Sequence, residues 1–364
     1  MNSKKINPNI ANKTVLLLAD FFLPMRKILP TIENLVKNKN KVIVASFFGQ
    51  ASLAPLADRL AETLERKFID LPSDAPRLPE YDIPHLYFAR NIGLLSGMRG
   101  GDIAIVENLN LLPKEMTSEL TAMSEIFVND DFSADSDRLR LLKKNLPSGH
   151  GLAFDRTDRN LVQFLSRSKK PQVLVLGGMT LAGKELLLDK LMARADTILV
   201  AGGVANLFFK LMDYQIGESD VDRNADEKAL KKLMRDYKSK IKLPVDVVVA
   251  AKKSGSASRK KPEKVGPGEM ISDIGPQTTL EFSKYLKQGR TLIWCGALGR
   301  VEETSFRHGT GALLRLFASR PSLPGVVAAA SGETVFNLLE EYGFLESLDL
   351  TMPETPALLR ALTK

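Results

Sequence analysis

The feature that most constrains the fold is a regular alternation of short apolar runs with amphipathic stretches. The nine apolar runs that we expect to be strands are residues 15–19, 41–46, 102–106, 125–129, 173–176, 197–200, 246–250, 291–294 and 326–329. The helical patterns between them cover residues 54–64, 185–193, 225–238, 278–286, 310–318 and 334–342. Several runs are almost wholly apolar, as in a sheet that is covered on both faces. This alternation predicts an α/β fold with parallel sheets.

The chain divides into two series of such elements. Its 364 residues are enough for two domains. One series ends near Gly149-His150-Gly151, and a polar helical stretch follows at residues 155–167. A second series then begins with the apolar run at residues 173–176. We therefore expect two α/β halves joined by a helix.

Composition argues against several other classes of protein. Apolar residues make up 44% and charged residues 26% of the chain, which is the balance of a globular protein. No apolar stretch approaches the roughly 20 residues that span a bilayer, and the first residues lack the apolar core of a secretory signal. The single cysteine, Cys295, excludes an internal disulfide, and with only three histidines a His/Cys zinc site is not expected. We expect a cytoplasmic monomer without a membrane partner.

Much of the net charge of +8 comes from one segment, residues 252–264. This segment holds six basic side chains and one acidic side chain, and it has no apolar periodicity. We interpret it as a solvated surface loop. A basic run of this kind can bind an anionic partner, but no aromatic residue interrupts it to stack on bases, which argues against a nucleic-acid partner.

A glycine-rich stretch follows the strand at residues 173–176. Read from Gly178, it fits the pattern G-x-x-x-x-G-K that cradles phosphates, and Lys184 is its lysine. The Ser or Thr that would bind magnesium is replaced by Glu185, so the phosphate-loop pattern is incomplete. The binding of an anion is still favoured here by glycines at a strand end, a helix N-terminus and a lysine. A plain tight turn with a solvated Lys184 is the alternative. A second pair, Gly202-Gly203, ends the next strand and would complete a shallow floor for a planar base.

Ten short segments extend this pattern into a family resemblance. They are residues 19–21, 29–32, 52–57, 106–109, 127–130, 175–178, 243–248, 273–276, 293–294 and 332–334. In this order they resemble the phosphoglycerate kinase family, from about Lys13 to the C-terminus. The resemblance implies two Rossmann-like parallel-sheet domains joined by a hinge helix.

The resemblance also implies where the domains begin and what each one does. The implied parts are an N-terminal domain at residues 1–153, a connecting helix at 154–170, a C-terminal domain at 171–345 and a tail at 346–364 that returns to the first domain. The first domain would bind 3-phosphoglycerate, and the second would bind ATP or ADP with Mg²⁺. The family's glycolytic reaction transfers a phosphate reversibly between 1,3-bisphosphoglycerate and ADP.

Most residues that match the family's site lie on the nucleotide side. The matching positions are Gly177, Gly178, Lys184, Gly202, Gly203, Glu302, Gly332, Glu333 and Thr334. Glu302 would accept hydrogen bonds from the ribose hydroxyls, and Glu333 stands where the family has the aspartate that serves the metal. On the substrate side Asp20 is retained from the family's R-V-D-F-N stretch.

The basic residues of the family's substrate pocket are missing. Phe47 and Gln50 replace a His and an Arg, while Asn110 and Asp137 replace two further arginines. One more arginine is absent with its loop, and the neighbouring stretches bring in aromatic and acidic residues. Anionic ligands need positive groups, so we predict that the family reaction is impaired or absent. On the nucleotide side, Pro353 and Glu354 interrupt the family's late glycine-rich loop.

Three other readings of the residues stay open. The first is a protein that has kept kinase activity toward a different, less anionic acceptor. The second is a non-catalytic nucleotide-binding or regulatory protein that uses residues 252–264 to bind an anionic partner. An ordinary active kinase would require that other basic side chains have moved into the pocket.

Overall fold

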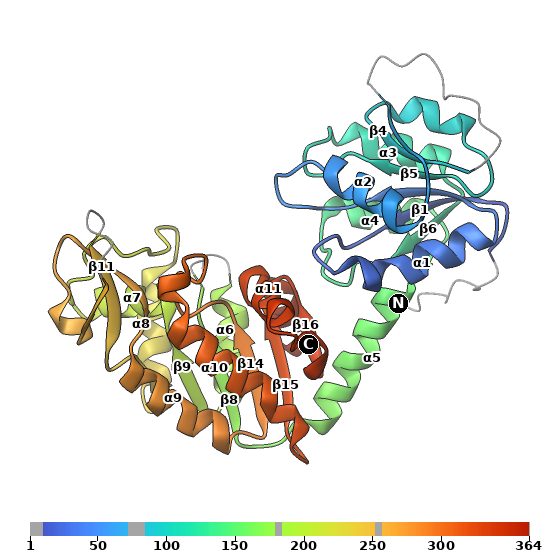
Figure 1. Ribbon diagram of the computed structural model, residues 1–364. Helices are drawn as coiled ribbons and strands as arrows, with labels where there is room; N and C mark the ends of the chain where they lie inside the picture. The colour runs from blue at the N-terminus through green and yellow to red at the C-terminus, as the bar shows by residue number, and fades with distance from the viewer. Residues whose placement is uncertain (1–9, 72–83, 179–183, 252–256, 364) are drawn as a thin grey trace. The chain divides into compact units, whose positions relative to one another are not determined.

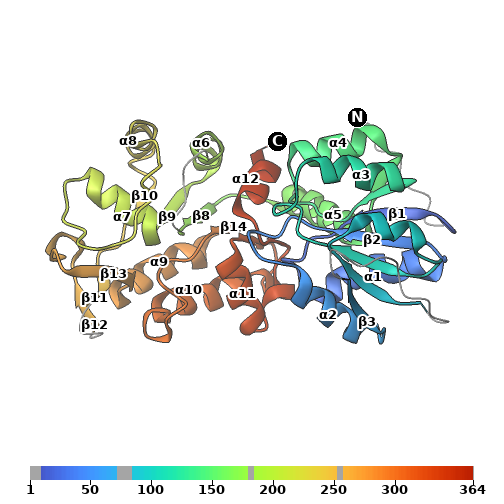
Figure 2. The same cartoon turned by 90° about the horizontal axis from the view of Figure 1, so that it is seen from above.

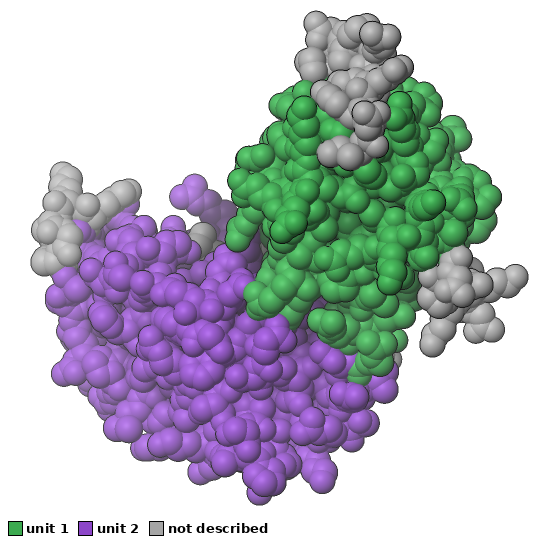
Figure 3. Space-filling model, turned by 45° about the vertical axis from the view of Figure 1, so that its right-hand side comes forward, with its two compact units in different colours: residues 1–159 green, residues 160–364 purple. Residues whose placement is uncertain are grey.

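The computed structural model describes residues 10–71, 84–178, 184–251 and 257–363 (Figure 1). The chain divides into two compact units, Met1–Arg159 and Asn160–Lys364, which Figure 3 shows in different colours. We call them unit 1 and unit 2. The helix α5 (Leu152–Arg167) carries the chain from one unit into the other.

Unit 1 is built on a parallel sheet whose seven described strands lie in the order β3-β4-β5-β2-β1-β6-β7. The strands are β1 (Thr14–Leu18), β2 (Lys41–Ala45), β3 (Phe68–Leu71), β4 (Leu86–Ala89), β5 (Ile103–Val106), β6 (Ile126–Asn129) and β7 (Ser148–His150). The helices are α1 (Met25–Lys37), α2 (Ala54–Thr63), α3 (Glu115–Met123) and α4 (Asp137–Asn145), with a short 3₁₀ helix at Ile92–Gly97.

Alternate residues of the strands in unit 1 enter two separate apolar cores. Val15 and Leu17 of β1 pack toward α1 and α2, whereas Leu16 and Leu18 pack toward α3 and α4. These strand residues are completely buried. A strand that is buried on both faces reads as a continuous apolar run, which explains why the sequence pattern located it.

Unit 2 contains a parallel sheet of six described strands in the order β10-β9-β8-β14-β15-β16. The strands are β8 (Gln172–Leu176), β9 (Thr197–Val200), β10 (Ile241–Lys242), β14 (Thr291–Cys295), β15 (Val327–Ser331) and β16 (Leu350–Met352). The helices are α6 (Glu185–Arg194), α7 (Gly202–Leu211), α8 (Glu227–Asp236), α9 (Pro276–Gln288), α10 (His308–Ser319), α11 (Glu333–Glu341) and α12 (Thr355–Thr363). Figure 2 shows α6, α8 and α12 on one side of this sheet and α9, α10 and α11 on the other.

Unit 2 also carries a small antiparallel sheet in the order β12-β11-β13. Its strands are β11 (Val247–Ala251), β12 (Ala257–Lys260) and β13 (Glu269–Ile274). The run at 246–250 was expected in a parallel sheet, so this part of the prediction is wrong. The loop predicted for 252–264 is also wrong for its second part, because residues 257–260 pair with β11 and residues 262–264 form a 3₁₀ turn. Residues 252–256 lie outside the described ranges.

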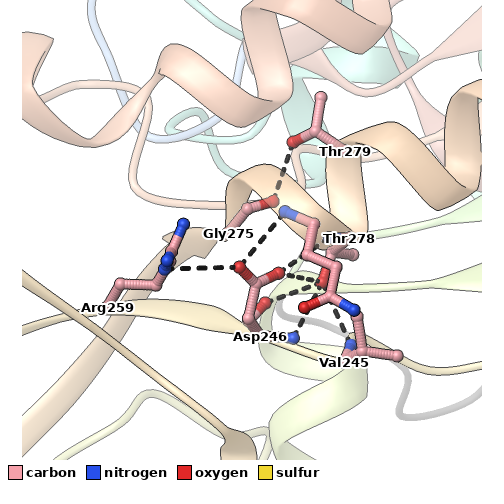
Figure 4. A network of polar contacts seen from close by, with 7 residues as sticks. Val245, Asp246, Arg259, Gly275, Thr278 and Thr279 are labelled. Carbon is pink, nitrogen blue, oxygen red and sulfur yellow. Dashed lines mark hydrogen bonds and ion pairs between the residues drawn. The ribbon is translucent and has the colours of Figure 1, made fainter.

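A buried carboxylate joins this small sheet to α9 (Figure 4). The Oδ1 atom of Asp246 accepts hydrogen bonds from the backbone N–H of Thr278 at 2.7 Å and from its hydroxyl at 2.7 Å. The Thr278 hydroxyl oxygen in turn accepts the N–H of Val245 at 3.0 Å. Arg259 lies 3.9 Å away and is mostly exposed, so it adds little. Asp246 therefore caps α9 and fixes the point where that helix begins.

The predicted elements are present, but seven of the described strands and five of the described helices (α1, α3, α4, α7 and α12) were not predicted. Each of the nine predicted strands is found within two residues of its expected ends. The sequence pattern does not predict α1, because this helix contains Pro30 and proline argues against a helix interior. Nor does it predict α7, which is buried over most of its surface and therefore shows no amphipathic pattern.

The C-terminal residues 346–364, for which the resemblance implies a return to the first domain, belong to unit 2. Within them β16 pairs with β15, and α12 packs against α6, where Arg194 donates to the carbonyl of Leu362 at 2.6 Å. Across the described ranges, no helix has both the length and the apolar character needed to cross a membrane.

Candidate functional site

The strand order of unit 2 defines one place where a ligand is expected. From β8 the chain moves through β9 to β10 in one direction, and from β14 through β15 to β16 in the other. The carboxyl ends of β8 and β14 are therefore adjacent, and the connections that leave them diverge. In open α/β sheets such a switch point is where ligands bind.

Glycines follow all four central strands at this edge, and we call Gly177, Gly178, Gly202, Gly296 and Gly332 the glycine floor. The backbone of the floor is joined across β8 and β14, because Gly178 donates to the carbonyl of Ala297 at 2.6 Å. A Cβ atom added at Gly177 would lie 2.3 Å from that carbonyl oxygen. Only glycine permits this approach, and the resulting surface is bare backbone.

The rest of the floor is equally restricted. Gly332 has a φ of 106°, and a Cβ atom there would lie 3.2 Å from the Cα of Gly296. Gly202 has a φ of 60°, and its Cβ would lie 2.7 Å from the Ala297 oxygen. The structure thus brings together four of the predicted glycines, while Gly203 is buried inside α7. Gly296 was not among the predicted residues, although its position directly after an apolar strand is the same signal.

Several of the described helices begin at this edge beside the floor. α6 follows β8, α7 follows β9 and α11 follows β15, so their free N–H groups and positive dipole ends meet at the switch point. Lys184 is the N-cap residue of α6 and is half-buried. Burial lowers its pKa below the ordinary value, against the opposing charges of Asp222 and Glu185. Residues 179–183, which complete the phosphate-loop pattern, lie outside the described ranges.

The other predicted nucleotide-side residues stand at the same edge of unit 2 but do not form a cluster of acids. Glu302 is exposed in the turn that follows β14, and Glu333 is the exposed first residue of α11. Thr334 follows it and is half-buried. Among the described residues, no group of three or more His, Cys, Asp or Glu side chains is placed to hold a metal ion. Mg²⁺ sites usually combine one or two carboxylates with substrate phosphates and water, so Glu333 by itself is not a complete metal site.

The carboxyl edge of unit 1 is lined by side chains rather than by bare backbone. Asp20, at the end of β1, is buried, and its Oδ1 atom accepts the N–H of Phe22 at 3.0 Å. The rings of Phe22 and Phe48 pack together with centroids 4.7 Å apart. Phe48 also packs on the core under α1 and α2, and Phe47 packs on the opposite core. These aromatic residues are half-buried rather than exposed.

Asn108 organises the loop that follows β2. Its side-chain oxygen accepts the N–H of Phe48 at 3.0 Å, and its amide donates to the carbonyls of Phe48 and Ala51 at 2.6 and 2.8 Å. Asn110, at a position where the family has an arginine, donates to the carbonyl of Gly49 at 3.0 Å. The amide groups therefore hold the loop closed on itself.

Glu107 anchors the two residues that precede α2. It accepts the N–H of Leu53 at 2.9 Å and the hydroxyl of Ser52 at 2.8 Å. Burial acts to raise the pKa of Glu107, but hydrogen bonds from the N–H groups of Leu53 and Asn108 and from Ser52 hold it below its ordinary value. This carboxylate is used to stabilise the fold, so its retention in the family pattern does not by itself indicate chemistry.

The acidic residues after β6 have structural roles as well. The Oδ1 atom of Asp131 accepts the N–H groups of Ser133 and Ala134 at 2.8 and 2.9 Å. Asp130 accepts the N–H of Phe154 at 2.9 Å and so anchors the first turn of α5. Burial raises the pKa of Asp130, against hydrogen bonds that include that of Phe154. These carboxylates are turned toward their own backbone.

Two arginines near this edge are also engaged within unit 1. Arg138, which the sequence analysis did not single out, donates to the carbonyls of Leu109 and Leu112, the latter at 2.6 Å. Asp137, which stands where the family has an arginine, pairs with Arg140 at 2.5 Å. The only signal for the role of Arg138 is its tertiary placement, since more than twenty residues separate it from its acceptors.

The fold and this site define a class: an α/β protein of two parallel-sheet units, one of which has a glycine-lined switch point. Comparison with known proteins makes the class specific. The family model described as phosphoglycerate kinase matches residues 6–363. The chain belongs to the phosphoglycerate kinase family, which confirms the resemblance.

Individual relatives agree with this assignment. A phosphoglycerate kinase of Coprothermobacter proteolyticus is 30% identical over 93% of this chain and 90% of its own length. One of Pelotomaculum thermopropionicum is 29% identical over 90% of this chain and 87% of its own length. The phosphoglycerate kinase structure from Pyrococcus horikoshii has a TM-score of 0.73 at 22% identity and covers 98% of this chain and 95% of its own. That structural likeness supports the fold alone.

Proposed function

We propose that this protein binds a magnesium–adenine nucleotide at the glycine floor of unit 2 and has severely reduced or no phosphoglycerate kinase turnover. Family membership supports a phosphoglycerate-kinase-like function in general. The reduced turnover is our inference from the residues of unit 1. The observation that carries it is that loops expected to bear basic side chains are instead held closed by aromatic and amide contacts.

The nucleotide part of the proposal rests on physical features that favour a phosphate chain. Bare backbone at the floor lets a ligand approach closely, and the N-termini of α6 and α11 supply N–H donors and positive dipole ends. Lys184 adds a positive charge. We further propose that Glu302 accepts hydrogen bonds from the ribose and that Glu333 and Thr334 face the metal-bound phosphates. When bound, Mg²⁺ would neutralise phosphate charge.

The substrate part rests on what replaces the family's basic residues. The Phe22 and Phe48 rings pack against each other at 4.7 Å, and the Asn110 amide is engaged with Gly49 at 3.0 Å. Each hydrogen bond to a charged group is worth about 1.5–3 kcal/mol, so losing four removes several factors of ten in affinity or rate. Asp20 could still accept a substrate hydroxyl, and we retain it as the proposed substrate-side residue.

Calorimetric titration of the full chain tests both parts separately. We expect binding of Mg-ADP and no measurable heat with 3-phosphoglycerate. A coupled assay for phosphoglycerate kinase turnover should give a rate at least ten-thousandfold below that of the Coprothermobacter proteolyticus relative. Ordinary turnover would overturn the substrate part, and absence of Mg-ADP binding would overturn the nucleotide part.

A second candidate is a kinase with a less anionic acceptor, and the Phe22–Phe48 pair favours an aromatic one. Aromatic side chains stack on aromatic ligands and do not bind phosphate. A panel of metabolites, tested by thermal shift with and without Mg-ATP, addresses this function. It is supported only if a compound raises the melting temperature beyond the effect of the nucleotide and does so less in Phe48→Ala.

A further inference from the structure

The end of the glycine floor at β15 and β16 carries a feature that the proposed nucleotide site does not explain. Ser331 of β15 is paired in register with Met352 of β16, so the chain segments that follow these strands leave the sheet side by side. The first leads through Gly332 into α11, and the second leads through Pro353 and Glu354 into α12. A carboxylate therefore precedes a helix at the edge of the floor.

The start of α12 lies directly against the floor. The Thr355 hydroxyl is 3.4 Å from the hydroxyl of Ser331. A Cβ atom added to Gly332 would lie 3.5 Å from the same Thr355 oxygen and 3.2 Å from the Cα of Gly296. Gly332 therefore has no room for a larger side chain between Gly296, which follows β14, and Thr355, the first residue of α12.

The direction of α12 brings another helix N-terminus to the same place. α12 packs against α6, and Arg194 at the end of α6 donates to the carbonyl of Leu362 at the end of α12. The two helices therefore run in parallel, and both begin at the carboxyl edge. With α11, three helix N-termini surround the ends of β8, β14 and β15, and this is where the phosphates of a bound nucleotide would be most stable.

Glu354 is placed at the N-terminus of α12 within this group. Its carbonyl accepts the N–H of Leu358 at 3.3 Å, so Glu354 is the residue at which the hydrogen bonding of α12 begins. The side chain is half-buried. Burial raises its pKa above the ordinary value, and the charge of Arg360 opposes this. A carboxylate at this position would repel a second anion.

We propose that Glu354 is a specificity-determining residue that takes the place of a terminal phosphate at the N-terminus of α12 and makes the site select a nucleoside diphosphate over a triphosphate. This inference rests on the proposed nucleotide function. The α- and β-phosphates would lie near Lys184 and the N-terminus of α11, whereas a third phosphate would extend toward α12 and meet the Glu354 carboxylate.

Titration calorimetry of the full chain with Mg-ADP and Mg-ATP tests this role. The native protein should bind Mg-ADP about tenfold more tightly than Mg-ATP, a factor that corresponds to about 1.4 kcal/mol. Glu354→Gln should raise the affinity for Mg-ATP about tenfold and change that for Mg-ADP less than twofold. Glu263→Gln, which removes an exposed charge on the segment after β12, should leave both affinities unchanged.

Two further variants separate charge from structure. Glu354→Ser is neutral and caps helices well, so it should reproduce the gain even if glutamine disturbs the turn. Glu354→Asp keeps the charge and should keep the preference for the diphosphate. Equal affinities in the native protein, or equal gains for both nucleotides in the neutral variants, would overturn the role of Glu354 alone. Absence of nucleotide binding in every form would overturn the proposed function, and this inference with it.

Discussion

The carboxyl edges of the two units follow the same architecture and differ in what covers them. At the edge of unit 1, Glu107, Asn108, Asp131 and Arg138 form hydrogen bonds with nearby backbone groups. At the edge of unit 2 the central strands end in glycines, and backbone is exposed beside helix N-termini. The difference shows that polar residues at a switch point indicate a ligand only when the fold does not already use their hydrogen bonds.

The largest expected effect comes from a substitution that places a side chain in the glycine floor of unit 2. In Gly177→Ala the new Cβ would lie 2.3 Å from the Ala297 oxygen, so the connection between β8 and β14 must shift. We expect at least a hundredfold loss of Mg-ADP affinity and a fall of about 2–4 kcal/mol in the free energy of unfolding. Gly268→Ala is the matched control, since a Cβ there meets nothing within 4 Å. Equal Mg-ADP affinities and equal free energies of unfolding in the two variants would contradict the proposed role of the glycine floor.

The second effect tests the closed edge of unit 1. Asn108 is completely buried and makes several hydrogen bonds with the loop at 48–51, each worth about 0.5–1.5 kcal/mol. Asn108→Ala should lower the free energy of unfolding by about 4 kcal/mol in denaturant titration and leave Mg-ADP affinity unchanged. Asn110→Ala removes a more exposed contact and should cost about 1 kcal/mol. A similar loss in both variants would show that Asn108 does not organise the loop.

The third effect concerns a buried acid of unit 2. Asp273 accepts the N–H of Gly309 at 2.7 Å and the hydroxyl of Thr310 at 3.1 Å, and so caps α10. Burial raises its pKa from 3.8 to about 6. The folded state therefore binds the proton more tightly than the unfolded state, and the stability from this group is complete below pH 4 and lost as the pH rises through 6.

The variant Asp273→Asn isolates this contribution. Relative to the variant, the native free energy of unfolding should fall by about 3 kcal/mol between pH 4 and pH 7. Urea titrations at several pH values measure the difference. A native-minus-variant difference that does not vary with pH would rule out the raised pKa.

The smallest effect is expected for Glu107 in unit 1, whose contribution to stability depends on pH in the opposite direction to that of Asp273. The folded-state pKa of Glu107 is held low, mainly by N–H donors acting against burial. Its contribution is therefore present above the ordinary pKa of 4.5 and lost as the pH falls through the lower folded value. Glu107→Gln should destabilise the protein at pH 7 and differ less from the native form near pH 3. A difference that grows toward low pH would refute the stabilising role of the ionised Glu107 carboxylate.

The amino-acid sequence predicted the glycine floor of unit 2 better than it predicted the contacts of unit 1. The glycine floor could be predicted because Gly177, Gly202 and Gly332 each follow an apolar run. The end of a strand can be identified from the local sequence alone. The use of Glu107 and Asn108 was not foreseeable. They match the family pattern in type, and only the structure shows that Glu107 anchors the residue before α2 and that Asn108 closes the loop at 48–51.

The sequence by itself determined the alternation of strands and helices, the family, and the absence of basic residues from the matched substrate positions. These are properties of residue type and local order. The tertiary structure decided which polar groups remain available to a ligand, because their partners are distant along the chain. Asn108 is sixty residues from Phe48, and Gly332 lies against Thr355 only because β15 and β16 are paired. Contacts of this kind depend on packing, which no local pattern encodes.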